Sequence, residues 1–485
     1  HFQIIGSLGG LLHSSVSPWR MNGGTQVMLG DYQNNSNVQY LEQIAPVQLP
    51  SEVDYDVIRR GLWESSDMMY KYSLGMMAQK TNYLQQNPLP ADEAGLADMQ
   101  PLPAVTHLEE REMPFVIDSV AFDQLVMELS AVFKDYKDIY NSSVMLNGLE
   151  MDIYRLTTEG VQLKKPGGAI SLAVSGSVRC DDGSSLSDSF SLSLQNPAEL
   201  PSIEQLKERT KAFAEGLLRL KSTPVVAEYY NGPVMFEGGA VATILANNLL
   251  NRGGLIATRS LGPTRGGLAD QFGQRIIDSR LTVKNYTAKK EYNGTPLYGY
   301  YEVDGEGVTP EAEMTLVDKG VFGKMLNGRI PTKNALETTG SSRFMMIPQS
   351  PTVATGTGTI HVQVDKGISH EKMKKALIKA AKEAGQSCAY IVRGISGATL
   401  EVYRVDLKDG RETRVRATSF RLPDLTKLLK LVAISSKEEV LNYLLNNYPA
   451  SMIYPAGVIV DGLVIEKATV KAEKEPVLTL PQQRK

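Results

Sequence analysis

Short apolar segments joined by tight, glycine-containing turns fill residues 292–343, and this stretch constrains the fold more than any other part of the chain. Its expected strands lie at residues 297–303, 312–317 and 321–326. The turns that follow them are Asp304-Gly305-Glu306-Gly307, Asp318-Lys319-Gly320 and Thr338-Thr339-Gly340-Ser341-Ser342-Arg343. Short turns of this kind favour antiparallel neighbours, so the stretch predicts an antiparallel sheet.

The size and composition of the chain limit the number of domains and the kinds of partner. It has 485 residues, 42% of them hydrophobic, which predicts two or three domains rather than one. The net charge is −3 with 22% charged residues, so nothing indicates a nucleic acid or an anionic membrane as partner. No run of about 18 apolar residues occurs, and no transmembrane helix is expected.

The two cysteines and the first residue bear on the cellular compartment. Cys180 and Cys388 lie far apart in the sequence, which excludes a disulfide framework and a cysteine-based zinc cluster but leaves one long-range disulfide open. The chain begins at His1, inside an expected strand over residues 2–5, so we expect the natural N-terminus to lie upstream. A signal peptide therefore stays open. The expected location is cytoplasmic, and export is the alternative.

The first half reads as a mixture of helices and a β meander. We expect a strand at residues 25–32 with a turn at 34–37, a loop or linker at 83–117, and a meander over 143–194 with turns at 148–150, 166–168 and 181–185. Helices are expected from residues 50–52 onward, over 119–136, and from 201–202 to 220. The inner face of the first helix is predicted to hold Ile58, Leu62, Met69, Tyr72 and Met76.

The second half is mostly β. A strand at 225–230 leads into a small-residue helix, a basic helix is expected at 370–385, and short strands recur near residues 280, 297, 312, 360, 390, 400, 414, 430 and 460. The pattern predicts an α+β protein. Its mixed α/β domain would span residues 1–223, with a mostly antiparallel β domain at 224–475, a curled sheet or open barrel with a few helices, and a tail at 476–485.

Several weak motifs in a fixed order resemble the TldD/PmbA peptidase family, whose members have been described as putative modulators of DNA gyrase. They are GDYQNNSN at residues 30–37, the helix segment 58–80, EYYNGPVMFEG at 228–238, the turns of residues 292–343 and the segment 448–467. The resemblance covers most of the chain. It implies the fold just described and a peptide or unfolded polypeptide as partner.

The resemblance also implies a metal site that this chain has lost. Active members of the family carry HExxxH on a helix, which holds zinc and a glutamate that activates the metal-bound water. In this chain the corresponding segment, expected on a helix, reads Phe236-Glu237-Gly238-Gly239-Ala240-Val241. Only Glu237 is kept, as a vestigial catalytic candidate, and we expect Phe236 and Val241 to fill the former site as core. No metal or other cofactor is expected.

Ligands for a metal elsewhere are scarce. The chain has five histidines, none at ligand spacing from another, and each reads as an ordinary surface or hydrogen-bonded residue: His1, His13, His107, His361 and His370. Cys388, the thiol closest to the family's cysteine position, lacks the glycine-rich context. The loop at residues 261–275 lacks a P-loop ending and is interpreted as a lid.

Three polar residues in the preserved turns are the substrate-binding candidates. Asp304 and Glu306 flank a tight turn and are predicted to lie near a cleft, although a plain hairpin turn with solvent-facing acids explains them equally simply. Arg343 is predicted to add a bidentate contact to a peptide carbonyl or carboxylate, with a loop-stabilising role as its alternative. We expect all three beside one groove with Glu237 at its floor.

Three functions are compatible with these patterns. The leading one is a metal-free, peptide-handling subunit that pairs with a zinc-bearing homologue. The second is an active hydrolase with a non-standard site built from Glu237 and the Asp304/Glu306 turn. The third is a non-catalytic, peptide-binding homodimer. In the leading one, the peptide is expected to thread between the subunits and add as a strand to an exposed sheet edge. Dimers are expected to form through the second half of the chain.

Overall fold

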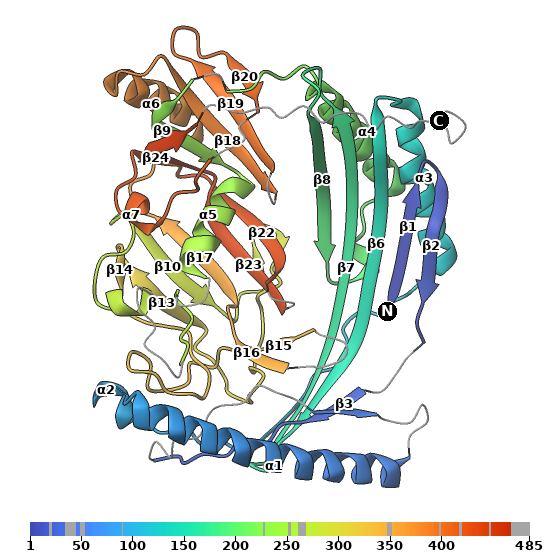
Figure 1. Cartoon of the computed structure of the whole chain (residues 1–485), viewed down its shortest axis with the longest axis vertical. Coiled ribbons are helices and arrows are strands. Elements are labelled where there is room, and N and C mark those ends of the chain that lie inside the picture. Colours follow the sequence, from blue (N-terminus) through green and yellow to red (C-terminus); the bar gives the residue numbers. More distant parts are fainter. Residues whose placement is uncertain are drawn as a thin grey trace, which may run out of the picture.

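The computed structural model describes residues 1–18, 22–33, 45–48, 54–89, 91–226, 228–250, 254–259, 268–346, 352–396, 399–416, 420–445 and 448–466. Figure 1 shows a long-stranded sheet on one side of the molecule, two further sheets on the other side, and the helix α1 lying across one end. The α+β class and the mostly antiparallel second half are confirmed, and the described sheets are open rather than closed into a barrel.

The first sheet belongs to the first half of the chain and has the order β2-β1-β6-β7-β5, with β8 also pairing with β7. Its strands are β1 (Phe2–Ser7), β2 (Gly10–Val16), β5 (Val105–Leu108), β6 (Ile139–Leu156), β7 (Val161–Arg179) and β8 (Ser185–Leu194). Only β5 runs parallel to its neighbour. A small separate hairpin joins β3 (Asn22–Thr25) to β4 (Ala45–Gln48).

Two amphipathic helices cover one face of this sheet. They are α3 (Ser119–Ala131), continued by the 3-10 turn η1 (Val132–Asp135), and α4 (Ile203–Arg219), which follows η2 (Pro197–Glu199). Ser202 caps α4 in a capping box with Gln205, the signal from which its start was expected. The core between helices and sheet includes Phe2, Leu129, Phe133 and Leu217, all at most 1% exposed.

Two six-stranded sheets form the second half. One has the order β14-β13-β10-β17-β23-β22, and the other has the order β20-β19-β18-β9-β24-β21. The strands of the first are β10 (Leu281–Tyr286), β13 (Glu313–Asp318), β14 (Val321–Phe322), β17 (Thr359–Val364), β22 (Glu438–Leu445) and β23 (Tyr448–Pro455). Those of the second are β9 (Tyr230–Glu237), β18 (Cys388–Ser396), β19 (Thr399–Asp406), β20 (Glu412–Val415), β21 (Ala433–Ile434) and β24 (Gly457–Ile465).

The remaining elements connect and cover these sheets. Two short hairpins pair β11 (Glu291–Tyr292) with β12 (Thr295–Pro296), and β15 (Ser342–Met345) with β16 (Thr352–Thr355). The remaining helices are α1 (Tyr55–Gln86), α2 (Ala91–Ala94), α5 (Gly239–Leu249), α6 (His370–Glu383), α7 (Leu425–Leu428) and the turn η3 (Leu268–Gln271). A second apolar core, separate from that of the first half, lies around α5 and both sheets. Within the described residues, no helix is both long and apolar enough to cross a membrane.

Several local predictions were wrong. The strand expected at 25–32 is instead β3, which ends at Thr25, and the strand expected at 225–230 begins only at Tyr230. The loop expected at 83–117 contains the end of α1, α2 and the paired strand β5. The turn expected at 34–37 and the helix start expected at 50–52 lie outside the described residues, and α1 begins at Tyr55 with Asp54 as its cap.

The meander has fewer turns than expected. Residues 148–150 and 166–168 lie inside β6 and β7 rather than in turns, so these two strands run unbroken for 18 and 19 residues. Residues 297–303 do not form a strand, although β13 starts within a residue of its expected position. Cys180 and Cys388 are both buried free thiols, so the disulfide left open does not form.

Candidate functional site

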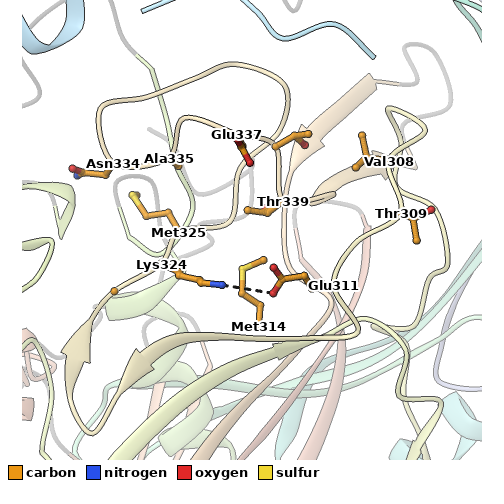
Figure 2. Close-up of a pocket in the computed structure, with 12 residues that line it drawn as sticks. Val308, Thr309, Glu311, Met314, Lys324, Met325, Asn334, Ala335, Glu337 and Thr339 are labelled. Carbon is orange, nitrogen blue, oxygen red and sulfur yellow. Dashed lines mark ion pairs between the residues drawn. The ribbon is translucent and has the colours of Figure 1, made fainter. Parts of the chain in front are cut away.

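A pocket of about 300 Å³ opens where two of the sequence motifs meet (Figure 2). One wall follows the Asp304–Gly307 turn, and the opposite wall is the loop that leads into Gly340. The side chains and backbone that line it come from Val308, Thr309, Glu311, Met314, Gly323, Lys324, Met325, Asn334, Ala335, Glu337, Thr338 and Thr339. Met314 and Met325 are each 4% exposed and form an apolar, deformable lining.

Charged groups mark the rim of this pocket. Figure 2 shows Lys324 directed toward Glu311, and their Nζ and Oε2 atoms lie 3.7 Å apart. Both side chains are more than half exposed, so this pair is weak and a ligand's own charge can replace either partner. The pocket therefore combines an apolar interior with one cation and two carboxylates, Glu311 and Glu337, at its edge.

The first half of the chain holds the pocket loop in place. Gln100 donates a side-chain hydrogen bond to the Leu336 carbonyl and accepts one from the Thr338 backbone N–H. From the second half, the Asn327 side-chain amide donates to the carbonyls of Ala335 and Glu337, at 3.1 Å each. The loop is thus fixed from both sides by amide side chains.

Asp304 and Glu306 point away from the pocket into the protein. Asp304 is 2% exposed, and its Oδ1 accepts hydrogen bonds from the backbone N–H groups of Glu306 (2.9 Å) and Val308 (2.8 Å). Glu306 is 4% exposed, and its Oε2 accepts from the Ser342 hydroxyl at 2.7 Å and from the Arg329 backbone N–H at 3.0 Å. The carboxylates join the Asp304–Gly307 turn to the turn that ends at Arg343 through Ser342, whose N–H also donates to Asp304 Oδ2 at 3.0 Å.

The environment of Asp304 changes its acidity. Burial, followed by the neighbouring charge of Glu306, raises the pKa of Asp304 to about 7, against the opposing effect of its backbone hydrogen bonds. The raised pKa makes the Asp304 carboxyl a weaker acid than the solvent-facing acids of an ordinary hairpin turn.

Arg343 is next to Ser342 and is also buried, at 6% exposure. Its guanidinium donates to the carbonyls of Thr357 (3.1 Å) and Pro449 (3.0 Å), and it lies 4.0 Å from the centre of the Tyr301 ring. In this arrangement Arg343 ties β15 to the segments around β17 and β23. Asp304, Glu306 and Arg343 are thus brought together, with their charged groups engaged inside the protein.

Glu237 lies in a different network, at the end of β9. Its Oε2 accepts a hydrogen bond from Arg393 Nε at 2.9 Å, and its Oε1 lies 3.6 Å from His370 Nε2. Arg393 in turn contacts Glu412 at 2.8 Å. Burial opposes the charge on Arg393, but the hydrogen bonds and charges of Glu237 and Glu412 raise its pKa above the ordinary value. In the part of the chain that the structure describes, no hydrogen bond or ion pair joins this network to Asp304, Glu306 or Arg343.

The segment around Glu237 is not the helix that was expected. Phe236 and Glu237 end a strand, Gly238 turns the chain with φ of 56°, and α5 begins at Gly239. Phe236 and Val241 are fully buried, and Phe236 packs against Phe420 with ring centres 5.9 Å apart. These apolar side chains and a carboxylate already bound by a guanidinium do not fit a zinc ion. Among the described residues, no group of three or more histidine, cysteine, aspartate or glutamate side chains is arranged to hold a metal.

Several residues of these networks could not be identified from the sequence. Arg393 and His370 come to Glu237 from β18 and α6, more than 130 residues further along the chain. His361, expected as an ordinary histidine, is buried and contacts Glu438 at 2.9 Å. Met314 and Met325 lie in segments of the sequence that were expected as strands, 312–317 and 321–326, with no sign of a pocket. Only the three-dimensional pairing of strands brings such residues together.

The fold and these sites define a class of α+β proteins in which a long-stranded first sheet is joined to two further six-stranded sheets. A "putative modulator of a DNA gyrase" from Thermotoga maritima has a similar structure, with a TM-score of 0.57 and 13% identity over 96% of this chain and 93% of that one. TldE from Thermococcus kodakarensis is similar with a TM-score of 0.54 and 14% identity, over 96% of this chain and 94% of that one. No protein-family model and no curated protein matches the sequence. The resemblance to the TldD/PmbA family is thereby confirmed at the level of the fold.

Proposed function

We propose that this chain is a metal-free, peptide-handling protein of the TldD/PmbA type, which provides walls and specificity for an unfolded polypeptide rather than a catalytic metal. The observation that carries the proposal is the pairing of Glu237 with Arg393, between the buried side chains of Phe236 and Val241. A glutamate acts as general base in a metallopeptidase only beside a metal-polarised water. In this chain the partner of Glu237 is the Arg393 guanidinium rather than a metal-bound water.

The pocket supports the peptide part of the proposal. Its volume of about 300 Å³ is at the lower end of the range for small-ligand sites and suits one or two amino-acid side chains. Met314 and Met325 adapt to different apolar side chains, as methionine-lined sites in general do. Lys324 and Glu337 at the edge offer partners for a peptide carboxylate or amine.

The role of Asp304, Glu306 and Arg343 in this proposal is to support the walls of the pocket. Their side chains hold the Asp304–Gly307 turn against β15, and Val308 and Thr309 follow that turn directly into the pocket lining. The separate apolar cores also favour the division of the chain into units at residues 1–223 and 224–475. The proposed partners are a peptide and a second subunit, either a copy of this chain or a zinc-bearing homologue.

Peptide binding is tested with a variant whose new side chain fills the pocket and leaves the surrounding residues in place. Gly323 lines the pocket, and a Cβ added there meets no atom within 4 Å, so Gly323→Leu inserts a side chain into open space. With fluorescein-labelled casein as an unfolded probe, we expect the full chain to bind and Gly323→Leu to weaken binding at least five-fold. Gly216→Leu, on α4 and with only the Arg219 side chain near its added Cβ, is the matched control and leaves binding unchanged.

A measurement of bound metal on the same protein tests the other part of the proposal, that the chain holds no catalytic metal. We expect well below one zinc per chain by elemental analysis after exposure to zinc. One tightly held zinc that disappears in Glu237→Gln, together with casein cleavage by the isolated chain, would establish the hydrolase alternative instead. Equal casein binding by Gly323→Leu and the wild type would remove the pocket from the proposal.

A further inference from the structure

The helix α1 is attached to the rest of the protein by a narrow and mostly polar face. It has 32 residues, about 48 Å at the rise of an α-helix. Its buried residues are Ser65, Met69, Ser73 and Lys80. Ser65 shares a hydrogen bond of 2.5 Å with Thr25, and Ser73 donates to the Val27 carbonyl at 3.2 Å. Two serines and one methionine bury little apolar area. The large apolar and aromatic side chains of the helix lie outside this buried face.

Those large side chains are exposed. Trp63 is 71% exposed, Tyr70 48% and Leu74 38%, and further aromatic residues on the same helix are Tyr55, Tyr72 and Tyr83. Trp63, Tyr70, Met77 and Leu84 recur at intervals of seven residues, with Leu74 beside them. Residues at this spacing follow one side of a helix, as the d positions of a helix pair do, and Leu74 occupies one of the a positions. The stripe formed by Trp63, Tyr70, Leu74, Met77 and Leu84 is here called the α1 stripe.

The charges of α1 do not oppose association with a like helix. Each exposed acid in the first half of the helix is paired within the helix itself: Asp56 with Arg59, Glu64 with Arg60, and Asp67 with Lys71. From residue 72 to residue 86 the only charged side chain is Lys80, which is buried. Half of a long surface helix therefore presents no charge to solvent, which is unusual for a surface that stays in water.

The area of the α1 stripe agrees with a partner helix rather than a small ligand. From the usual size of these side chains, Trp63, Tyr70 and Leu74 expose roughly 350 Å² on each helix. Two copies therefore supply about two thirds of the roughly 1,000 Å² that a specific interface requires, before any flanking residue is included. Figure 1 shows α1 lying across one end of the molecule.

From these observations we infer that α1 is a self-association surface, on which a second copy of this chain packs its own α1 through the α1 stripe about a twofold axis. A twofold arrangement lets the same residues serve both subunits. This inference goes beyond the proposed function, because it concerns assembly and does not depend on peptide binding. It also places the contact in the first half of the chain rather than the second half, where the resemblance led us to expect dimers.

The test uses light scattering of the full chain at about 20 μM. We expect the wild type to be a dimer and Trp63→Ser/Tyr70→Ser to be a monomer with unchanged circular dichroism. The matched control is Tyr140→Ser/Tyr154→Ser, which removes two aromatic side chains from β6 that are 59% and 65% exposed, and it stays dimeric. A monomeric wild type, or a stripe variant that stays dimeric, would overturn the inference.

A second measurement does not depend on weakening the interface. Both natural cysteines are buried, so a cysteine introduced on α1 reacts without interference from them. Leu74→Cys is expected to form a disulfide-linked dimer under mild oxidation, whereas Arg59→Cys at the charged end of α1 forms far less. Equal crosslinking of Leu74→Cys and Arg59→Cys would contradict the proposal that the α1 stripe is the interface. Casein binding is measured on the same variants, so a failed assembly test leaves the proposed function unaffected.

Discussion

At the scale of single residues, the nature of the partner decides what Glu237 does. A carboxylate near a metal-bound water accepts its proton, whereas a carboxylate hydrogen-bonded to a guanidinium serves as a structural anchor. Glu237, Arg393 and Glu412 form such an anchor between β9, β18 and β20. The sequence singled out Glu237 as a candidate, but no pattern in it indicated Arg393 as the partner of Glu237.

Arg393→Met should therefore destabilise the fold. It leaves Glu237 and Glu412, with side chains 17% and 23% exposed, without their shared cation. We expect a loss of about 1–3 kcal/mol in the free energy of unfolding, measured by urea denaturation, since hydrogen bonds to charged groups contribute on that scale. The control Lys379→Met removes an exposed pair with Glu383 and should cost less than about 0.5 kcal/mol. Equal effects would mean that the Glu237 network contributes no more than a surface pair.

Asp304 predicts a specific dependence of stability on pH. Its pKa rises from 3.8 in the unfolded chain to about 7 in the fold, so the folded state binds a proton that the unfolded state releases between these values. The stabilisation is fully present below about pH 4 and is lost as the pH rises through about 7. In Asp304→Asn, the unfolding free energy should fall less between pH 5 and pH 8 than in the wild type, by urea titration at each pH. An identical slope in the variant would contradict the raised pKa, and Asp409→Asn on the surface serves as control.

At the scale of elements, the spacing of apolar residues was a better guide to helices than the positions of glycines were to turns. α3, α4 and α6 lie close to their expected places because apolar residues at helical spacing face a core in each. The turns expected at 148–150 and 166–168 failed because their glycines permit close packing inside strands. A Cβ on Gly148 would lie 2.1 Å from the Phe2 ring, and one on Gly168 would lie 2.3 Å from the Gln195 carbonyl. The sequence does not distinguish this use of glycine from a turn.

The same ambiguity explains the strand wrongly expected at 297–303. Its alternating apolar residues do pack inward, yet Gly299 brings the backbone against Gly358, where a Cβ would lie 2.4 Å from the Gly358 carbonyl carbon. The segment is thus held by close backbone approach and by side chains such as Tyr301, whose hydroxyl donates to the Gly340 carbonyl at 2.9 Å. A pattern of alternating hydrophobicity indicates which residues are buried, but it does not show whether their segment pairs with another strand.

The turn between β6 and β7 carries a testable contact with the second half. Glu159 accepts hydrogen bonds from both terminal nitrogens of Arg329, at 2.7 and 2.8 Å, and Arg329 is 4% exposed. Glu159→Gln leaves a buried guanidinium without its carboxylate and should cost about 3 kcal/mol of unfolding free energy by urea denaturation. Arg329→Lys, which keeps the charge but loses the paired geometry, should lie between this variant and the wild type. A loss below about 0.5 kcal/mol in Glu159→Gln would show that the contact is not stabilising.

At the scale of the whole molecule, the two largest apolar cores are joined by polar contacts and by one small apolar cluster. In this cluster Val303, Val308 and Phe344 of the second half pack against Leu102, Val161 and Leu163 of the first half. The contact of Glu159 with Arg329 is one of the polar contacts, and another is formed by Arg416, which donates to the Ser184 hydroxyl at 2.7 Å and pairs with Asp182. Between them, the Tyr298 hydroxyl donates to Glu199 at 2.5 Å. Polar contacts and a small cluster couple the two large cores more weakly than one continuous apolar core would.

The coupling between the two cores can be measured by calorimetry. We expect Glu159→Gln/Asp182→Asn to melt in two transitions that are further apart than any in the wild type, because each core then unfolds more independently. Lys211→Met, which removes a surface pair with Glu208 within α4, is the control and should leave the shape of the melting curve unchanged. A single, sharp transition in the double variant would show that the cores are coupled by other means.

The length of β6 and β7 has a mechanical consequence. At the usual rise of a strand, 19 residues extend about 60 Å, from the core beneath α3 and α4 to Glu159 and Arg329. Because the β6–β7 hairpin is this long, a tilt of a few degrees at its base displaces its far end by several ångströms. That end is bound to Arg329, whose guanidinium also holds the Gln100 carbonyl, and Gln100 holds the pocket loop at Thr338. The long hairpin is thereby connected to the pocket loop by a continuous chain of hydrogen bonds through Glu159, Arg329 and Gln100.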